Sequence, residues 1–479
     1  MASSKVPDRS TFTTQDSLRS VSIPSDEKPC LPSSLKISNL AQSSIGLSAL
    51  LASTIHGLRN HIPPPKVTVA RDHSSIEFKS ERLYTIDGKP PASAWGPLSG
   101  IHKTSDGYVR VHDGFPHHRA GTKALLGCDP DATREDVSSK ISSWCSLDLE
   151  SAAVDAGLVI SALRSYEQWD SLPQAEAIPD LPIQLRKIGD APPLNIPESD
   201  SGRLSPGNDK CVRGLRVLEF SRVIAAPLAG KTLAAHGADV LWVTSPNLPG
   251  SPSLDREFGR GKRTIQLDLI SENDLAEAVH LANDADVFIQ GYRPGALSAR
   301  GLSTENLLAE RSKDKGLIIA NMSAYGPSGP WSNRRGFDSL VQIATGMNVS
   351  EAEHFGSGDN EAARALPCQA LDHASGYFLA AGIMAALHKQ ISEGGSWVVD
   401  VSLAGTGRYL RSLGQYEGRT GFGAPGYGSN ADVKGDYLEL GESGFGRMEF
   451  IRHSGVVEGV CVGWDVLPKA LGSDEKRWL

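Results

Sequence analysis

Short apolar runs alternate with longer amphipathic stretches through the second half of the chain. The runs have the length of strands and are rich in Val, Ile, Leu and Phe, whereas the stretches between them carry apolar residues at helical spacing. The strand candidates are 215–220, 239–243, 286–289 and 317–321, and the clearest helix candidates are 228–236 and 272–283. This alternation predicts an α/β fold built on a doubly wound parallel sheet. Such sheets bind ligands beyond the carboxyl ends of their strands.

The first part of the chain has a different pattern. An apolar helix candidate at 44–58 is followed by a short strand candidate at 66–70, and a similar order recurs within 375–401. A compact stretch at 107–156 then mixes strand and helix signals. We therefore expect a smaller α+β domain at about residues 84–180.

Polar and proline-rich segments mark the expected boundaries. Residues 1–32 are rich in Ser, Thr, Asp and Lys and have no apolar core, which predicts a disordered lead. Residues 191–210 contain several Pro, Ser, Gly and Asp residues and are interpreted as a linker. These segments divide the chain into an N-terminal part at 33–190 and a C-terminal part at 211–479.

Asp372 is the leading candidate for chemistry. It follows a short polar loop and precedes the apolar, Ala-rich run 378–387, a pattern typical of a loop entering a buried helix. Its carboxylate would lie at the helix N-terminus, where free N–H groups and the helix dipole favour negative charge, so we expect it to be ionised. The same local pattern also fits a plain helix cap, and the motif alone leaves both interpretations open.

Composition excludes several classes of protein. The net charge of −8 argues against a nucleic-acid binder, which needs a basic footprint. The six cysteines are scattered without a CxxC pair, so neither a metal site nor a disulfide framework is indicated, and a reducing compartment is expected. No apolar run is long enough to span a membrane. We expect a cytoplasmic protein, with mitochondrial or peroxisomal locations left open.

Five motifs in the C-terminal part occur in the order found in one family. They lie at 214–223, 261–269, 292–302, 323–330 and 368–377, the last containing Asp372. Together they resemble the class III CoA-transferases, the family of formyl-CoA and carnitine-type CoA-transferases. The resemblance implies that 211–479 form the large domain of such an enzyme.

The N-terminal part is similar to the latter half of the same family. Residues 107–157 resemble its small domain, and 182–190 resemble the segment that returns to its large domain. The chain therefore resembles two incomplete tandem copies. Family members form interlocked dimers, so the resemblance implies an intramolecular pseudo-dimer or a homodimer. No Asp or Glu occurs from 31 to 71, so a second copy would lack an equivalent of Asp372.

The resemblance also implies a mechanism and a set of contacts. Asp372 would attack an acyl-CoA to form a mixed anhydride and then an aspartyl-CoA thioester, which passes CoA to a carboxylic acid. CoA and acyl-CoA are substrates, and neither a permanently bound cofactor nor a metal is expected. The residues matched to the family's CoA contacts are Arg222, Val223, Ile224, Ala225, Lys262, Gly291, Tyr292, Arg293, Arg300, Ser323, Tyr325 and Gly326. Ile224 stands where some transferases have Gln, an oxyanion-type donor.

Two other functions compete with CoA transfer. Acyl-CoA racemases of the same family use a His just before an Asp, and here that position is Phe337 before Asp338. Phe carries no proton, which disfavours racemase chemistry. A degenerate, non-catalytic scaffold is the third hypothesis, and retention of Asp372 in its motif favours an enzyme instead.

Overall fold

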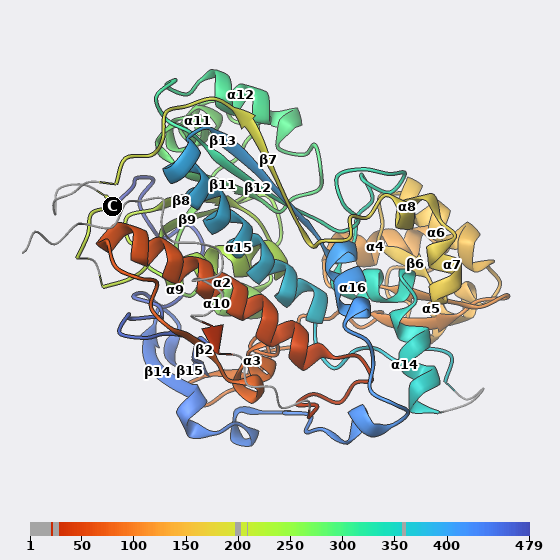
Figure 1. Cartoon of the computed structure of the whole chain (residues 1–479). Coiled ribbons are helices and arrows are strands. Elements are labelled where there is room, and N and C mark those ends of the chain that lie inside the picture. The colour runs from red at the N-terminus through yellow and green to blue at the C-terminus, as the bar shows by residue number, and fades with distance from the viewer. Residues whose placement is uncertain (1–20, 23–27, 197–202, 208, 357–360) are drawn as a thin grey trace, which may run out of the picture.

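The computed structural model describes residues 21–22, 28–196, 203–207, 209–356 and 361–479. Its main feature is a seven-stranded sheet with the order β10-β9-β8-β11-β12-β13-β7 (Figure 1). The strands from β10 to β13 pair in parallel, and β7 joins β13 in antiparallel fashion at one edge. The strands are β7 (Ile183–Gly189), β8 (Arg216–Phe220), β9 (Asp239–Thr244), β10 (Arg263–Gln266), β11 (Val287–Gln290), β12 (Ile318–Ser323) and β13 (Ser396–Ser402). The prediction of a doubly wound parallel sheet is confirmed.

Helices cover both faces of this sheet because its strands are apolar on both faces. Val217 and Ile289 belong to the core that also contains residues of α9 and α15, whereas their neighbours Leu218 and Phe288 belong to a second core with residues of α11 and α12. The flanking helices are α9 (Ala225–Ala235), α10 (Pro252–Phe258), α11 (Glu272–Asp284), α12 (Thr304–Ala309) and α15 (Ala370–Glu393).

Two long helices, α2 and α15, lie side by side at the centre of the molecule (Figure 1). Each has 24 residues, and each is followed by a strand and a helix. The strand after α15, β13, pairs in parallel with β12 and antiparallel with β7, and the strand after α2, β2, pairs in parallel with β1 and antiparallel with β16. The elements concerned are β1 (Val21–Ser22), α2 (Ile37–Asn60), β2 (Val67–Val69), α3 (Arg71–Glu77), α16 (Leu403–Ser412) and β16 (Gly455–Val457). The element order around α15 is thus repeated, in shorter form, around α2.

A small α+β domain is present where the sequence indicated one, with narrower limits. Its antiparallel sheet and helices enclose a separate core that runs from Leu98 to Ala162. The predicted start near residue 84 instead falls in β3, which pairs with β15 in another sheet. The domain consists of β4 (Gly100–Lys103), β5 (Tyr108–Val111), α4 (Pro116–Leu125), α5 (Arg134–Ile141), α6 (Ser146–Asp155) and β6 (Ile160–Ala162).

Shorter elements connect these parts. Two short helices lead from the small domain to β7, and two more precede α15. A third small sheet, of order β14-β15-β3, joins the N-terminal part to the end of the chain. These elements are β3 (Tyr84–Ile86), α7 (Tyr166–Asp170), α8 (Pro173–Glu176), η1 (Ser298–Arg300), α13 (Asp338–Ala344), α14 (Met347–Phe355), η3 (Thr420–Gly423), η4 (Asn430–Asp432), η5 (Gly435–Tyr437), β14 (Leu438–Ser443) and β15 (Gly446–Ile451).

The expected lead falls largely, and the expected linker partly, outside the described residues. Of the lead, 1–20 and 23–27 are not described, and Leu31, near its end, is buried in the core. Of the linker, 197–202 and 208 are not described, and Leu204 belongs to the same core. Within the described residues, α15 is long and apolar enough to cross a membrane, and most of it is buried inside the protein.

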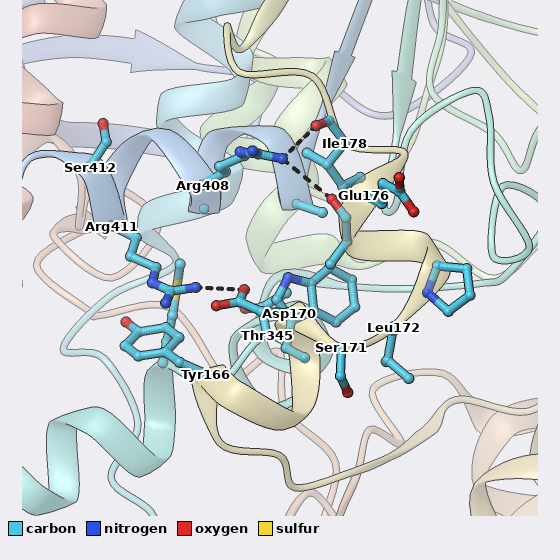
Figure 2. Close-up of a pocket in the computed structure, with 16 residues that line it drawn as sticks. Tyr166, Asp170, Ser171, Leu172, Glu176, Ile178, Thr345, Arg408, Arg411 and Ser412 are labelled. Atoms are coloured by element: carbon cyan, nitrogen blue, oxygen red, sulfur yellow. Dashed lines mark hydrogen bonds and ion pairs between the residues drawn. The ribbon is translucent and has the colours of Figure 1, made fainter.

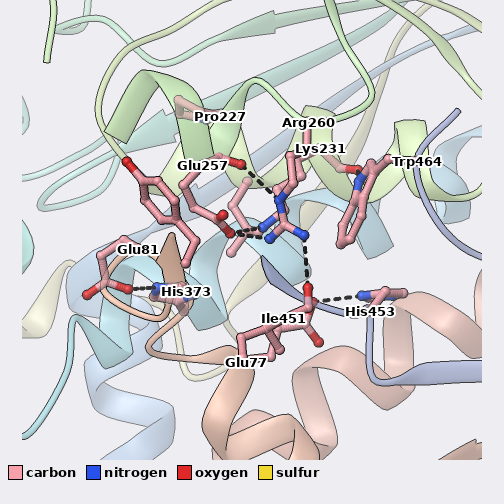
Figure 3. A network of polar contacts seen from close by, with 12 residues as sticks. Glu77, Glu81, Pro227, Lys231, Glu257, Arg260, His373, Ile451, His453 and Trp464 are labelled. Atoms are coloured by element: carbon pink, nitrogen blue, oxygen red, sulfur yellow. Dashed lines mark hydrogen bonds and ion pairs between the residues drawn. The ribbon is translucent and has the colours of Figure 1, made fainter. Parts of the chain in front are cut away.

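A network of buried ion pairs joins α9 and α10 to the end of the chain (Figure 3). Glu257 accepts hydrogen bonds from Lys231 and Arg260, and Arg260 also donates to the carbonyl oxygen of Ile451 at 2.8 Å. All three charged side chains are fully buried. Buried charges of this kind are tolerated only while each keeps its partner, so the network fixes how α9 and α10 meet the end of the chain.

We expect Glu257→Ala to lower the free energy of unfolding by about 3–5 kcal/mol, because it leaves two buried cations without their shared counter-charge. Urea denaturation of the full chain measures the loss. Glu393→Ala is the matched control, because its partner Lys389 is exposed and such pairs contribute below about 1 kcal/mol. Equal losses in the two variants would contradict this prediction.

Candidate functional site

A cavity of about 350 Å³ lies at the carboxyl ends of β8, β11 and β12, where a doubly wound sheet is expected to bind its ligand. The turn after β8, the loop after β11 and the start of α15 form one side, and α4 of the small domain forms the other. The lining residues are Phe115, His117, His118, Val159, Arg222, Val223, Ile224, Ala225, Ala226, Leu248, Gly291, Tyr292, Arg293, Pro294, Ala296, Met322, Ser323, Ala324, Arg334, Arg335, Gly336, Phe337, Asp372 and Leu403.

Asp372 lies at the base of the cavity, in the first turn of α15. Its side chain is 6 % exposed, and no described residue forms a hydrogen bond with its carboxyl group. The helix cap is a different carboxylate: Asp338 Oδ2 accepts the backbone N–H groups of Leu371 at 2.8 Å and Asp372 at 3.0 Å. The two interpretations that the sequence left open are therefore separated, because Asp338 caps the helix and Asp372 keeps its carboxyl group free.

The pKa of Asp372 is shifted in the direction opposite to the one that the helix N-terminus favours. Burial raises the pKa of Asp372 well above its usual value, and the nearby carboxylates of Asp338 and Glu81 raise it further. Desolvation and like charges outweigh the helix dipole here. Burial also raises the pKa of Asp338, to about 6, although three hydrogen bonds to its carboxylate oppose the shift.

The walls of the cavity are cationic. Asp372 is the one acidic residue among those that line it, and four arginines, Arg222, Arg293, Arg334 and Arg335, line it as well. Arg222 packs 4.3 Å from the ring of Phe115, which joins the large domain to the small one. Such a cavity suits an anionic ligand.

Close packing holds Asp372 against the turn that follows β8. Gly376, one turn further along α15, has no room for a side chain, because an added Cβ would lie 2.7 Å from the carbonyl oxygen of Ala225. Within the turn, Val223 has a φ of 76°, a left-handed conformation that is strained for a β-branched residue. Both features bring the start of α9 close to the carboxyl group of Asp372.

A second, smaller cavity of about 230 Å³ continues from the first. It shares Leu248, Tyr292 and Ala296 with the first cavity and extends to Arg300 and to Thr244 at the end of β9. The two cavities therefore adjoin each other along the carboxyl edge of the sheet.

The structure brings most of the residues predicted from the motifs to the walls of these two cavities. Arg222, Val223, Ile224, Ala225, Gly291, Tyr292, Arg293 and Ser323 line the same cavity as Asp372, and Arg300 lines the continuation.

Three predicted residues lie elsewhere. Lys262 is fully buried beneath α9, where its Nζ donates to Glu219 Oε1 and to the carbonyl oxygen of Pro227, both at 2.7 Å. Tyr325 is buried against Trp331, and Gly326 forms the turn beside it, with its N–H donating to Ser323 Oγ at 3.2 Å. Their motifs shape the loop walls, and these side chains do not reach the cavity.

Several lining residues carried no signal in the sequence. Phe115, His117 and His118 lie far from the motifs and reach the cavity only because the small domain packs across its mouth. Arg334 and Arg335 directly precede the Gly336–Asp338 segment, and none of the five motifs includes them. The described residues contain no group of three or more His, Cys, Asp or Glu side chains placed to hold a metal ion.

A larger cavity, of about 770 Å³, lies between α7, α8 and α16 (Figure 2). Its charged side chains are paired with the protein itself: Arg411 contacts Asp170 at 2.7 Å, and Arg408 donates to the carbonyl oxygen of Ile178 at 2.7 Å. None of the residues that line it belongs to the five sequence motifs, so it is a weaker candidate for chemistry than the smaller cavity around Asp372.

Comparison with known proteins agrees with the geometry. Residues 212–430 match the family model of CoA-transferase family III. An acyl-CoA transferase of Gibberella moniliformis is 26% identical over 430 residues, which cover 82% of this chain and 74% of that protein. The acetyl-coenzyme A transferase nodX of Hypoxylon pulicicidum is 24% identical over 84% of this chain and 73% of that protein. These matches are too long for the part from residue 211 onward to supply alone, so they extend into the N-terminal part.

Bacterial relatives match a shorter region. The probable fatty acyl-CoA transferase Rv3272 of Mycobacterium tuberculosis is 35% identical over 40% of this chain, and the match spans about half (50%) of that protein. A crystal structure of Rv3272 superimposes with a TM-score of 0.39 over 43% of this chain and 56% of that one, at 32% identity. Residues 212–430 of this chain are thus similar to CoA-transferase family III, and the named relatives are similar to the same part of the chain.

Proposed function

We propose that the protein moves CoA from an acyl-CoA donor to a carboxylic acid acceptor, with Asp372 as the nucleophile. The observation that supports this most directly is the free carboxyl group of Asp372 in a cavity lined by four arginines. Relatives named as succinyl-CoA:glutarate and acyl-CoA transferases support the same reaction class.

The reaction follows from what a buried carboxylate can do. An Asp372 oxygen attacks the thioester carbonyl carbon, the C–S bond breaks, and CoA leaves as the thiolate while a mixed anhydride forms. The thiolate then attacks the Asp372 carbonyl carbon of the anhydride, which releases the donor acid and leaves an aspartyl-CoA thioester. An acceptor carboxylate reverses both steps. Acyl activation is conserved throughout, so a difficult exchange is divided into easier ones.

The environment of Asp372 suits this role. A carboxylate with several hydrogen bonds is stabilised and therefore a weaker nucleophile, whereas the Asp372 carboxyl group has no such bond from the described residues. Its pKa is raised by burial, so the ionised form is reactive, and the arginines at the walls favour that form once a ligand excludes water.

We further propose one active site per chain, in a pseudo-dimer formed around α2 and α15. The residue of α2 at the helix position of Asp372, the third, is Asn39. Its side-chain oxygen accepts a hydrogen bond from Arg71 at 2.6 Å, and an amide cannot form the anhydride. The N-terminal part instead supports the active copy, because Glu81 accepts a hydrogen bond from His373, the neighbour of Asp372, at 3.0 Å (Figure 3).

The competing functions have less support. At the position that a racemase needs for its histidine, Phe337 stacks on His112 with ring centroids 4.1 Å apart, so the second proton carrier is missing there. A non-catalytic scaffold would gain nothing from a buried carboxyl group without a hydrogen bond, which lowers stability.

Asp372→Asn should reduce CoA exchange by about a thousandfold or more, because an amide cannot replace the nucleophile. Exchange is measured with acetyl-CoA and succinyl-CoA as donors and a panel of carboxylic acids as acceptors. Mass spectrometry should also find CoA on the peptide that contains Asp372, only in the unmutated chain. Asp170→Asn, in the larger cavity, is the control and should keep its activity. Full exchange by Asp372→Asn would overturn the proposal.

The same variant should be more stable than the unmutated protein at neutral and higher pH. The pKa of Asp372 is higher in the folded than in the unfolded state, so its contribution to stability is lost as pH rises above about 4. Removing this ionisation should raise the melting temperature by roughly 2–4 °C at pH 8 and by little at pH 4. If the difference in melting temperature between Asp372→Asn and the unmutated protein were the same at pH 4 and pH 8, the raised pKa of Asp372 would be contradicted.

Asp338→Asn should shift the acid limb of the pH dependence of kcat/KM towards lower pH. Removing a neighbouring negative charge lowers the pKa of Asp372, so the nucleophile ionises earlier. The Asn side-chain oxygen can still accept an N–H from the start of α15. An acid limb that does not move, in a variant that remains folded, would show that another group controls it.

A further inference from the structure

One wall of the catalytic cavity is formed by α4 of the small domain. His118 is the third residue of this helix, lines the cavity and is 5 % exposed. Its ring packs edge-on against Phe337, with centroids 6.2 Å apart. Phe337 is followed by Asp338, whose carboxylate binds the N–H of Asp372. His118 therefore lies in contact with the segment that holds the nucleophile in place.

The imidazole of His118 has no hydrogen-bond partner among the described residues. Its Nδ1 is buried without a hydrogen bond, and no described group bonds to Nε2. His102, in the same domain, shows the usual arrangement, with its ring nitrogens 2.7 Å from Ser138 Oγ and 2.9 Å from the carbonyl oxygen of Leu98. A buried polar group without a partner lowers stability, so its retention beside a ligand cavity indicates a role in binding or chemistry.

The neutral ring of His118 suits a hydrogen-bond donor rather than a positively charged counter-ion. Burial, together with the neighbouring His117, His112, Arg335 and Arg222, lowers the pKa of His118 to about 3. The ring is neutral at physiological pH and carries one N–H. Because Nδ1 has no acceptor nearby, the proton is better placed on Nε2, which leaves an N–H for the cavity. A neutral imidazole can polarise a carbonyl oxygen without forming a salt bridge to the nucleophile.

Most other side chains around Asp372 are not available to polarise a carbonyl oxygen of the ligand. Ile224, in the turn after β8, is apolar. Arg222 donates to the carbonyl oxygen of Pro249, and Arg335 donates to that of Gly157. Arg334 stacks 3.8 Å from the ring of Trp331 and lies 3.6 Å from Glu150. Three of the four lining arginines are thus already engaged with the protein.

We propose that His118 is a second catalytic residue, whose imidazole N–H donates a hydrogen bond to the carbonyl oxygen of the acyl group. This inference rests on the proposed CoA transfer. When Asp372 attacks the thioester, the carbonyl π electrons move to oxygen, and the N–H of His118 stabilises that oxyanion. When the C–S bond breaks, the carbonyl forms again and the thiolate leaves. His118 keeps its proton throughout.

His118→Phe should lower kcat by about 10²–10³-fold, the usual loss for one oxyanion donor, and change KM for acetyl-CoA much less. His118→Gln keeps an N–H donor and should recover most of the loss. Thr122→Val is the matched control: Thr122 is buried one turn further along α4, does not line the cavity, and should leave kcat unchanged. Equal kcat in His118→Phe and the unmutated chain would overturn the role.

A spectroscopic measurement tests the contact without turnover. Acetyl-CoA labelled with ¹³C at its carbonyl is bound to Asp372→Asn, which cannot react, and the carbonyl stretch is recorded by infrared difference spectroscopy. A hydrogen bond from His118 lowers this frequency relative to free acetyl-CoA. The shift should disappear in the double variant with His118→Phe and persist in that with Thr122→Val. If the double variant with His118→Phe showed the same carbonyl frequency as Asp372→Asn alone, the proposed contact would be overturned.

The two proposals fail in different ways. If CoA transfer is wrong, the unmutated chain forms no CoA adduct on the Asp372 peptide. If only the role of His118 is wrong, that adduct forms in the unmutated chain and forms at the same rate in His118→Phe. Quenched single-turnover mixing with acetyl-CoA, followed by mass spectrometry, separates these results.

Discussion

The start of α15 depends on a carboxylate from another helix. Asp338 accepts the N–H groups of Leu371 and Asp372, so the free donors of the helix end are satisfied without using the side chain of Asp372. This arrangement leaves one buried carboxyl group as a cap and a second one free in the cavity. Because two carboxylates so close together resist ionising at the same time, the cap also raises the pKa of its neighbour.

The N-terminal part of the chain contributes to the surroundings of Asp372 at several points. Its long helix α2 packs along α15, Glu81 binds His373 beside Asp372, and β7 completes the edge of the large sheet. Its small domain supplies residues of α4 that line the same cavity as Asp372. A C-terminal half alone would expose the apolar flank of α15 and leave the cavity open to water, which would weaken the electrostatic interactions inside it.

The distribution of charge around the cavity follows from this construction. Cations from β-strand loops of the large domain and from the segment before α13 gather around one acid, while histidines of the small domain stay neutral because they are buried beside those cations. The positive walls suit an anionic ligand. The neutral imidazoles allow a donor to stand near a carboxylate without neutralising it.

Local sequence determined the elements and the position of Asp372. Strand and helix spacing identified the parallel sheet, because apolar periodicity depends only on neighbouring residues, and the motif around Asp372 placed it at the start of a buried helix. Tertiary structure decided the rest. Lys262 pairs with Glu219, Asp338 caps α15, and His118 reaches the cavity through contacts between residues distant in the chain. The direction of the pKa shift of Asp372 was decided in the same way: a pKa is set by the burial and charges that the folded chain gathers around a group, and neither is encoded in its immediate neighbours.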